Sequence, residues 1–307
     1  MKELSIIIPT FERGEIFLSS FKAAKEATKN IDAEIIVVND SKDQEIQLEN
    51  YESVLVVNNK GKGVASARNF GATLATSENL VFLDDDMFLT KESIERLLYY
   101  FNKAEKAFYL FNWDYPPELY ELLQKSKFGR YLIRYNFVSL KGWLGDEWEE
   151  KDVFQLNMGA SYCLPIKKKH FDEIGGYNED FPHAGAEDYE FFTRSKKVGF
   201  KTFVDTTITI YQNEKDRIVM QNWLSRKKRN GETISVAVQL GHDELKFSYN
   251  AIKKTIYPVL ILSKPFFYFI YKLVPNVKWM DILSFRIINT LLGTYLFEGY
   301  HSTDSKG

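Results

Sequence analysis

The chain has 307 residues, of which 45% are hydrophobic and 27% charged, a composition that suits a folded globular protein with one large core or two smaller ones. The formal net charge of -2 provides no broad positive field, so we expect no nucleic-acid partner. Cys163 is the single cysteine, which excludes an intrachain disulfide and agrees with a reducing compartment such as the cytoplasm.

Short runs rich in Ile and Val predict buried strands of a parallel sheet in the first part of the chain. They lie at 4–8, 34–38, 54–57 and 80–83, and polar or turn residues follow each one. Helical patterns lie at 16–28, 64–75 and 91–101, the last with Thr90 as its N-cap. Alternating strands and helices predict a doubly wound α/β sheet, whose ligands gather beyond the carboxyl ends of the strands.

The later segments change in character along the chain. Region 113–151 is aromatic and charged with weak periodicity, and we expect helices and loops there. A strand at 154–165, helices at 167–174 and 188–198, and one or two strands at 202–211 follow. Only helical patterns come after residue 213, at 215–240, 244–273 and 278–297. The sequence therefore predicts two domains, an α/β domain over 1–213 and a helical extension over 214–307.

The helical extension has a one-sided charge. Seven basic residues and a single acidic one, Asp281, lie between 246 and 297, among many large aromatic residues. Two interpretations remain open: the helices lie on an anionic membrane surface, or they pack on the α/β domain or on a second subunit of a homodimer. Lys264, Pro265 and Lys272 interrupt the longest apolar stretch, so we expect no transmembrane helix. The predicted location is cytoplasmic, or peripheral at the inner face of the membrane.

Three carboxylates in a row, Asp84, Asp85 and Asp86, follow the fourth predicted strand. Their mutual repulsion would be relieved by a divalent cation, which prefers carboxylate oxygens. On an extended backbone Asp84 and Asp86 would share one face. The alternative is a solvated acidic turn that caps the next helix. We favour the cation site because the cluster falls at the ligand-binding edge of the sheet.

Three further patterns each leave two interpretations open. Glu187 and Asp188 begin a predicted helix, where a carboxylate serves as a general base or merely caps the helix. The Gly61-Lys62-Gly63 turn before another helix offers N–H groups to a phosphate, or is a flexible basic turn. Asp40 ends the second strand and either accepts hydrogen bonds from a ribose or base, or forms an Asx-turn.

Six segments, taken together and in order, resemble the family 2 glycosyltransferases. They are SIIIPTF at 5–11, VVNDS at 37–41, GVASARNFG at 63–71, FLDDD at 82–86, GGYNEDF at 175–181 and EDYE at 187–190. The resemblance covers residues 3–212. It implies the GT-A fold, a nucleotide-sugar donor with uridine diphosphate as the default leaving group, and a divalent cation, Mn²⁺ or Mg²⁺. It also implies inverting transfer of one sugar to a glycan or lipid-linked acceptor hydroxyl.

The resemblance also implies which residues surround the donor. Those expected to line the nucleotide-sugar site are Pro9, Thr10, Glu12, Asp40, Arg68, Asp84 and Asp85. Within this set, Asp40 would contact the base, Arg68 the phosphates and Asp84 the ribose. Asp86 would ligate the metal that bridges the diphosphate.

On the acceptor side, Asp188 would be the general base, with Glu187 beside it, while Gly176 and Tyr177 would shape the sugar and acceptor side. Many relatives carry a histidine ligand after the last core strands, where this chain has Gln212 and Asn213. Water, Asn213 or His183 would then complete the coordination, although His183 also suits an ordinary loop.

Two competing functions share some of these features. Phosphatases with an aspartate nucleophile also place Asp-x-Asp after a strand, but they use the first strand, and they have threonine or valine where this chain has Phe88. A non-catalytic sugar-binding relative is the other alternative. The retained Asp84, Asp86 and Asp188 argue against it.

Overall fold

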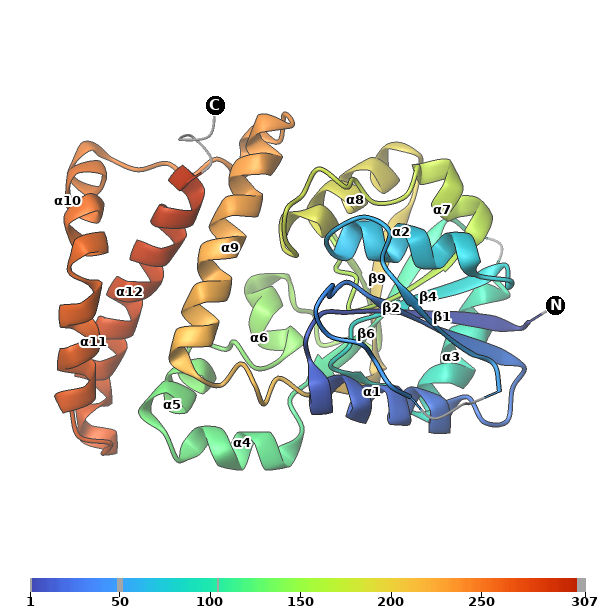
Figure 1. Ribbon diagram of the computed structural model, residues 1–307, viewed down its shortest axis with the longest axis horizontal. Helices are drawn as coiled ribbons and strands as arrows, with labels where there is room; N and C mark the ends of the chain where they lie inside the picture. The colour runs from blue at the N-terminus through green and yellow to red at the C-terminus, as the bar shows by residue number, and fades with distance from the viewer. Residues whose placement is uncertain (1, 49–51, 104, 303–307) are drawn as a thin grey trace. The chain divides into compact units, whose positions relative to one another are not determined.

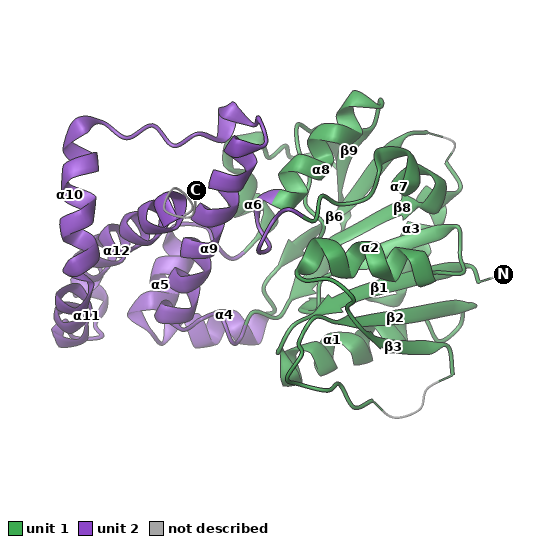
Figure 2. Ribbon diagram, turned by 45° about the horizontal axis from the view of Figure 1, so that its top comes forward, with its two compact units in different colours: residues 1–116, 139–179, 187–214 green, residues 117–138, 180–186, 215–307 purple. Residues whose placement is uncertain are grey.

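The computed structural model describes residues 2–48, 52–103 and 105–302, and the chain forms two compact units (Figures 1 and 2). The first unit comprises residues 1–116, 139–179 and 187–214. The second comprises residues 117–138, 180–186 and 215–307. The second unit therefore draws two short segments from the first 213 residues as well as the helices that follow them.

The first unit is built on a five-stranded sheet with the order β3-β2-β1-β4-β8. The strands are β1 (Leu4–Thr10), β2 (Ala33–Asn39), β3 (Val54–Asn58), β4 (Asn79–Leu83) and β8 (Cys163–Lys167). The first four are parallel, and β8 runs antiparallel to β4. All residues of β1 are buried, which explains the run of isoleucines at its centre, Ile6–Ile8. The predicted doubly wound α/β class is confirmed.

Helices cover both faces of this sheet (Figure 1). Helix α2 (Val64–Leu74) lies on one face, and α1 (Gly14–Ala27) and α3 (Lys91–Phe101) lie on the other. A Cβ atom at Gly71 would meet the Ile7 side chain at 2.4 Å, so glycine lets α2 lie directly on β1. The strand order reverses between β1 and β4, which makes their carboxyl ends the topological switch point where ligands of such sheets bind.

A second, smaller sheet surrounds the long strand β9 (Lys201–Gln212). The parallel strand β6 (Ala107–Asp114) and the antiparallel strands β5 (Met87–Phe88) and β7 (Val153–Leu156) pair with it. The sequence analysis missed β6, an aromatic strand that carries no clear alternation. The single strand predicted at 154–165 is wrong, because β7 and β8 belong to different sheets and a turn joins them.

The other helices of the first unit agree with the patterns in the sequence. Thr90 caps α3 as predicted, since its hydroxyl accepts a hydrogen bond from the Ser93 N–H. The predicted helices at 167–174 and 188–198 are present as α7 (Lys168–Ile174) and α8 (Ala186–Lys197). The region predicted as helices and loops contributes α6 (Leu140–Leu144) and the 3₁₀ turn η1 (Gly145–Glu147) to this unit.

The second unit is helical in the residues that the structure describes. Its elements are α4 (Pro117–Gln124), α5 (Lys127–Arg134), α9 (Met220–Gln239), η2 (Asp243–Leu245), α10 (Ala251–Leu262), α11 (Lys264–Leu273), η3 (Lys278–Met280) and α12 (Asp281–Ser302). A Cβ atom at Gly299 would meet the Lys228 carbonyl oxygen at 1.9 Å, so α9 and α12 pack backbone to backbone. The single helix predicted at 244–273 is wrong: α10 and α11 meet at a bend of 69°, where Pro265 begins a new helix.

Among residues 2–48, 52–103 and 105–302, no single helix has both the length and the apolar composition needed to cross a membrane. Helices α10 and α11 taken together meet both criteria in spite of their bend.

Candidate functional site

The acidic residues after β4 form a turn. The Met87 N–H donates to the Asp84 carbonyl oxygen at 3.1 Å, and the Asp84 N–H donates to the Tyr162 carbonyl oxygen at 2.9 Å. The extended backbone expected at Asp84–Asp86 is therefore wrong, because the chain has to reverse before β5 joins the second sheet. The turn separates the three carboxylates: Asp84 faces Arg68, whereas Asp85 and Asp86 share Arg13.

Asp85 and Asp86 face the end of β1, the neighbouring strand in the sheet. The Thr10 hydroxyl donates to Asp85 Oδ2 at 2.6 Å. Arg13 Nη2 lies 3.0 Å from Asp86 Oδ2, and its Nη1 lies 3.8 Å from Asp85 Oδ1. On the other side, Gln212 Nε2 donates to Asp86 Oδ1 at 3.3 Å. The sequence analysis missed Arg13, although its position directly after Glu12 at the carboxyl end of β1 was the available signal.

Arg68 of α2 joins the acidic turn to the start of α8. Its Nη2 lies 2.9 Å from Asp84 Oδ1, and its Nη1 lies 3.3 Å from both Glu187 Oε1 and Asp188 Oδ1. The residue is only 2% exposed. Burial opposes the guanidinium charge, but Asp188, Asp84 and Glu187 outweigh it and raise the pKa of Arg68. Its Nε–H has no partner among the described residues, so one donor of this buried side chain is unused.

Asp188 is held by a second group, Ser161. The Ser161 N–H donates to Asp188 Oδ2 at 3.1 Å, and its hydroxyl donates to Asp188 Oδ1 at 2.6 Å. The Ser161 hydroxyl also lies 2.6 Å from the Tyr177 hydroxyl, and the Tyr177 ring lies 5.0 Å from the Arg68 guanidinium. Asp188 is the third residue of α8, and its carboxylate is 22% exposed. It is thus oriented by Ser161 and Arg68 and remains open to solvent, as a proton acceptor must be.

The pKa of Asp84 depends on charges from both parts of the site, Asp86 in the same turn and Asp188 in α8. Loss of hydration raises the pKa of Asp84, the Arg68 charge lowers it, and the charges of Asp86 and Asp188 raise it again. The turn after β4 and the start of α8 are therefore one charged cluster, although they lie far apart in the sequence.

The glycine-rich turn before α2 is hydrogen-bonded to Asp40. The Asp40 carboxylate accepts from Asn59 Nδ2 at 2.7 Å, and its two oxygens accept from the Gly63 N–H at 3.0 and 2.9 Å. Gly63 has φ +88°, a conformation that favours glycine. The Asx-turn considered for Asp40 is formed by Asn39 instead, whose Oδ1 accepts from the Ser41 N–H. Contact between Asp40 and a base stays a prediction.

A hollow lies beyond the carboxyl ends of β1 and β2. Its lining residues are Thr10, Glu12, Arg13, Gly14, Phe17, Leu18, Asn39, Gln44, Glu45, Ile46 and Gln47. Thr10 and Glu12, two of the residues predicted for the nucleotide, are in this lining, whereas Pro9 is buried within β1. The hollow therefore adjoins Asp85 through Thr10 and occupies the position expected for a nucleotide.

The residues predicted for the acceptor side have different surroundings. Tyr177 is 3% exposed; its ring packs against the Arg68 guanidinium and its hydroxyl hydrogen-bonds with that of Ser161. Gly176 has φ +67°, and a Cβ there would meet Asn69 Oδ1 at 2.8 Å. His183 belongs to the second unit, where its Nε2 lies 3.2 Å from Glu232 Oε2. The acceptor roles of these three residues stay predictions.

The donor set has to be compared with what a divalent cation needs. Within the described part of the chain, no group of three or more His, Cys, Asp or Glu side chains could hold a metal ion. In the described part of the first unit, five carboxylates lie together in the cluster, those of Asp84, Asp85, Asp86, Glu187 and Asp188, with the guanidinium groups of Arg13 and Arg68 among them. Such a cluster would repel a diphosphate. It fits a cation that takes one or two carboxylate oxygens from the protein and its other ligands from phosphate oxygens and water.

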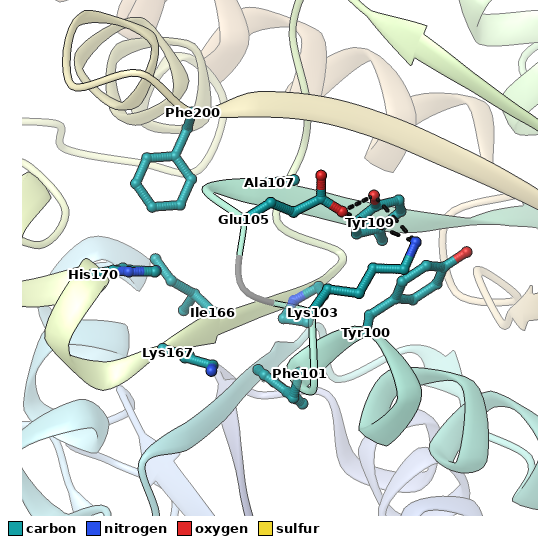
Figure 3. A pocket seen from close by; sticks show the side chains of 11 residues that line it. Tyr100, Phe101, Lys103, Glu105, Ala107, Tyr109, Ile166, Lys167, His170 and Phe200 are labelled. Atoms are coloured by element: carbon teal, nitrogen blue, oxygen red, sulfur yellow. Dashed lines mark hydrogen bonds and ion pairs between the residues drawn. The ribbon is translucent and has the colours of Figure 1, made fainter.

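A different hollow lies at the opposite end of β4 (Figure 3). Ile166 and Lys167 in its lining pair with Leu80 and Asn79, the first residues of that strand. Figure 3 shows Lys103 and Glu105 both reaching the Tyr109 hydroxyl inside it. None of the predicted site residues lines this hollow, so it is separate from the carboxylate cluster.

Comparisons with known proteins point to glycosyltransferases. A family model described as glycosyl transferase family 2 matches residues 5–152, and one described as the N-terminal domain of galactosyltransferase matches residues 159–221. The mannosyltransferase PcManGT from Pyrobaculum calidifontis, solved in complex with GDP-Man and Mn²⁺, aligns over 98% of this chain and 88% of its own. The TM-score is 0.54 and the identity 11%, a likeness that concerns the fold.

Two curated relatives are each 24% identical to the chain. One is an uncharacterized glycosyltransferase of Haemophilus influenzae, matched over 62% of this chain and 61% of its own length. The other is the Escherichia coli UDP-Glc:alpha-D-GlcNAc-diphosphoundecaprenol beta-1,3-glucosyltransferase WfaP, matched over 83% of this chain and 95% of its own. The chain thus spans less than two thirds of the first relative and nearly all of the second.

The fold is that of the GT-A glycosyltransferases, and the family model and the curated relatives make the chain a glycosyltransferase. The family model over residues 5–152 and the curated relatives support its assignment to family 2 of the glycosyltransferases. This similarity leaves the phosphatase hypothesis without support.

Proposed function

We infer that the protein is an inverting glycosyltransferase that moves one sugar from a nucleotide-diphosphate sugar to an acceptor hydroxyl, with Asp188 as general base. The observation that carries this proposal is the Arg68 guanidinium, which lies within 3.3 Å of both Asp84 and Asp188. One side chain therefore links the Asp-x-Asp turn, expected at the donor, to the carboxylate expected at the acceptor. We assign this chemistry to residues 1–213 as the catalytic domain, with 214–307 as its helical extension.

The proposed reaction is a direct displacement at the anomeric carbon. Asp188 accepts the proton of the acceptor hydroxyl while the acceptor oxygen bonds to that carbon. The bond from the carbon to the phosphate oxygen breaks at the same time, and its electron pair leaves with the nucleoside diphosphate. Asp188 suits this role because Ser161 and Arg68 fix its carboxylate without excluding it from solvent. A positioned base contributes about 10²–10⁴-fold to such a reaction.

The donor would occupy the switch point. Thr10 and Glu12 would line the nucleotide pocket, Asp40 would contact the base, and Arg68 would offer its unused Nε–H to phosphate. Asp86, with Asp84 nearby, would hold the divalent cation. When bound, that cation would offset the negative charge that develops on the leaving diphosphate.

We propose a UDP-sugar as donor and a glycan or lipid-linked sugar as acceptor, in the synthesis of a cell-envelope polysaccharide. The name of the Escherichia coli relative specifies UDP-Glc and a diphosphoundecaprenol acceptor, which supports a UDP-sugar donor and a lipid-linked acceptor. The same proposal places the enzyme in the cytoplasm as a peripheral protein at the inner face of the membrane.

Thermal unfolding with a panel of nucleoside diphosphates, each with and without Mn²⁺, tests the donor site. A ligand at 100 times its dissociation constant stabilises the folded protein by about 2.7 kcal/mol. We expect a Mn²⁺-dependent shift with UDP. A shift with UDP that is independent of Mn²⁺ would remove the cation from the proposal, and no shift with any nucleotide would contradict the donor site.

The Asp188→Asn variant tests the base. We expect it to keep the UDP-induced shift and to lose transfer by about 10²–10⁴-fold, because only the proton acceptor is removed. Asp172→Asn, an exposed aspartate of α7, is the matched control and should transfer normally. Full activity of the Asp188 variant would show that the base assignment is wrong.

A further inference from the structure

The outward side of α10 and α11 is apolar. None of the residues in these two helices is buried. Large apolar side chains that are 47–83% exposed follow one another at Ile252, Ile256, Val259, Leu262, Phe266, Phe269 and Leu273. Their spacing of three or four residues continues across the bend, so each helix carries them on one face. We call these seven side chains the α10–α11 stripe.

Two tyrosines of the same helices, Tyr257 and Tyr268, point towards the rest of the second unit. The Tyr257 ring stacks on Phe297 with centroids 4.8 Å apart, and the Tyr268 hydroxyl lies 3.2 Å from the Tyr295 hydroxyl. A helix on the surface of a water-soluble domain normally buries its apolar side and exposes its polar side. The reversed arrangement indicates that the stripe has an apolar partner outside this unit.

The charge around the stripe limits what that partner is. Residues 246–280 contain six lysines and no acidic residue. Lys253, Lys254, Lys272 and Lys278 are exposed, and Trp279 beside them is 78% exposed. Exposed lysines, large apolar side chains and tryptophan together are typical of helices that lie in the headgroup layer of an anionic membrane. A second copy joined through the same surface would instead bring lysines against lysines.

We propose that the α10–α11 stripe binds an anionic lipid bilayer, lying in its headgroup layer with the flanking lysines on lipid phosphates. The proposal deepens the peripheral location proposed above and rests on it. The helices lie on the bilayer and do not cross it, because Lys264 at the bend is paired with Glu298, which also holds Lys228 at 3.0 Å. Crossing would carry these charges into the hydrocarbon layer.

Sedimentation of the full chain with lipid vesicles tests this surface without donor or acceptor. We expect the protein to bind vesicles of phosphatidylcholine mixed with phosphatidylglycerol, to bind pure phosphatidylcholine much less, and to be released by high salt. Binding that resists both salt and alkaline carbonate would show insertion across the bilayer and would overturn the proposal.

Two double variants identify the residues. Lys253→Gln with Lys254→Gln should weaken binding by about 30-fold, since each lysine near an anionic surface contributes about fivefold. Lys196→Gln with Lys197→Gln, an adjacent exposed pair on α8, is the matched control and should bind as the native chain does. Phe266→Ser with Phe269→Ser should weaken binding by about 30-fold or more, because both rings leave the interface. Tyr99→Ser, an exposed aromatic of α3, is its control.

The results separate this proposal from the enzymatic one. If the α10 and α11 variants bind vesicles like the native chain, the stripe is not the lipid surface, whatever the enzyme transfers. If the phenylalanine variant turns a dimer into a monomer in light scattering and still binds vesicles, a second copy covers the stripe. Transfer to a water-soluble acceptor should be unchanged in all four variants. If the native chain also shows no transfer, the proposed function is contradicted, but the vesicle result still holds.

Discussion

Replacing Arg68 by methionine removes the one cation that three carboxylates share. Asp84, Glu187 and Asp188 all lie within 3.3 Å of its guanidinium, and the Arg68 side chain is 3% exposed. Removing one partner of a fully buried ion pair lowers the free energy of unfolding by about 3–5 kcal/mol. The loss should be smaller here, about 2–3 kcal/mol, because Asp84 and Asp188 are 35% and 22% exposed and keep part of their hydration. We expect a loss of that size at neutral pH, measured by urea unfolding followed by circular dichroism.

The loss should depend on pH in a definite direction. The pKa of Asp84 in the folded protein is raised above its ordinary value of 3.8, so the folded state holds this proton more strongly than the unfolded chain. Stability from this group is therefore present at low pH and declines as pH rises through the range above 3.8. Arg68 lowers the pKa of Asp84, so removing the Arg68 charge raises this pKa further and extends the pH range over which stability declines to higher pH. The methionine variant should thus be closer to the native chain at pH 5 than at pH 8.

A matched control removes a cation from an exposed pair. Lys91 lies 3.6 Å from Glu95 with both side chains more than half exposed, and Lys91→Gln should leave the urea midpoint unchanged. The reasoning about Arg68 is refuted if its variant loses less than about 1 kcal/mol. A loss of equal size at pH 5 and pH 8 would also refute it, because lost packing alone would not depend on pH.

Three further predictions follow from single contacts. Ser161→Ala removes the hydroxyl that donates to Asp188 at 2.6 Å, and should lower kcat about tenfold while leaving the donor dissociation constant unchanged in steady-state kinetics and calorimetry. A Tyr177→Phe variant, which keeps that donor, should retain most of the rate. Asp40→Asn takes one carboxylate oxygen from the Gly63 N–H, and should weaken UDP binding by about tenfold in calorimetry with no loss of thermal stability beyond about 1 kcal/mol. Gly299→Ala places a methyl group against the Lys228 carbonyl oxygen and should destabilise the second unit by about 1–3 kcal/mol, whereas Ser302→Ala at the end of the same helix should not.

The strands of the central sheet were predictable because burial on both faces leaves little choice of residue. Every position of β1 is buried, and its centre is accordingly a run of three isoleucines, Ile6, Ile7 and Ile8. The position of the acidic cluster at the end of β4 could be read from the sequence, because three aspartates follow directly after a buried strand, although the turn that they form could not. The pairing of β6 with β9 was not, because Tyr109, Phe111 and Trp113 give no alternation and the partner strand lies far along the chain.

The contacts that make the cluster a site are long-range and carry no local signal. Ser161 is 27 residues before Asp188, and Arg68 is 120 residues before it. No periodicity or spacing connects such positions; only the strand order, which places β8 beside β4, brings them together. The bend between α10 and α11 was missed for the opposite reason, since a strong helical pattern on both sides concealed the local effect of Pro265.

The charge of the cluster leads to a prediction about how the nucleotide binds. The cluster brings five carboxylates together next to the place proposed for a diphosphate. UDP should therefore bind weakly when divalent cations are chelated. Asp85→Asn removes one of these charges while its amide oxygen still accepts the Thr10 hydroxyl, which now donates at 2.6 Å.

With divalent cations chelated, Asp85→Asn should bind UDP about five- to tenfold more tightly than the native chain. The reason is that a unit charge a few ångströms from the diphosphate contributes about 1 kcal/mol or more, at an effective dielectric constant between those of water and protein. Calorimetry of both proteins with and without Mn²⁺ measures this. Asp172→Asn, which removes a charge from α7 outside the cluster, should leave the affinity unchanged. Equal UDP affinity of the native chain and Asp85→Asn in chelator would mean that the cluster's charge does not reach the diphosphate, and the nucleotide would have to lie elsewhere than at the carboxyl ends of β1 and β4.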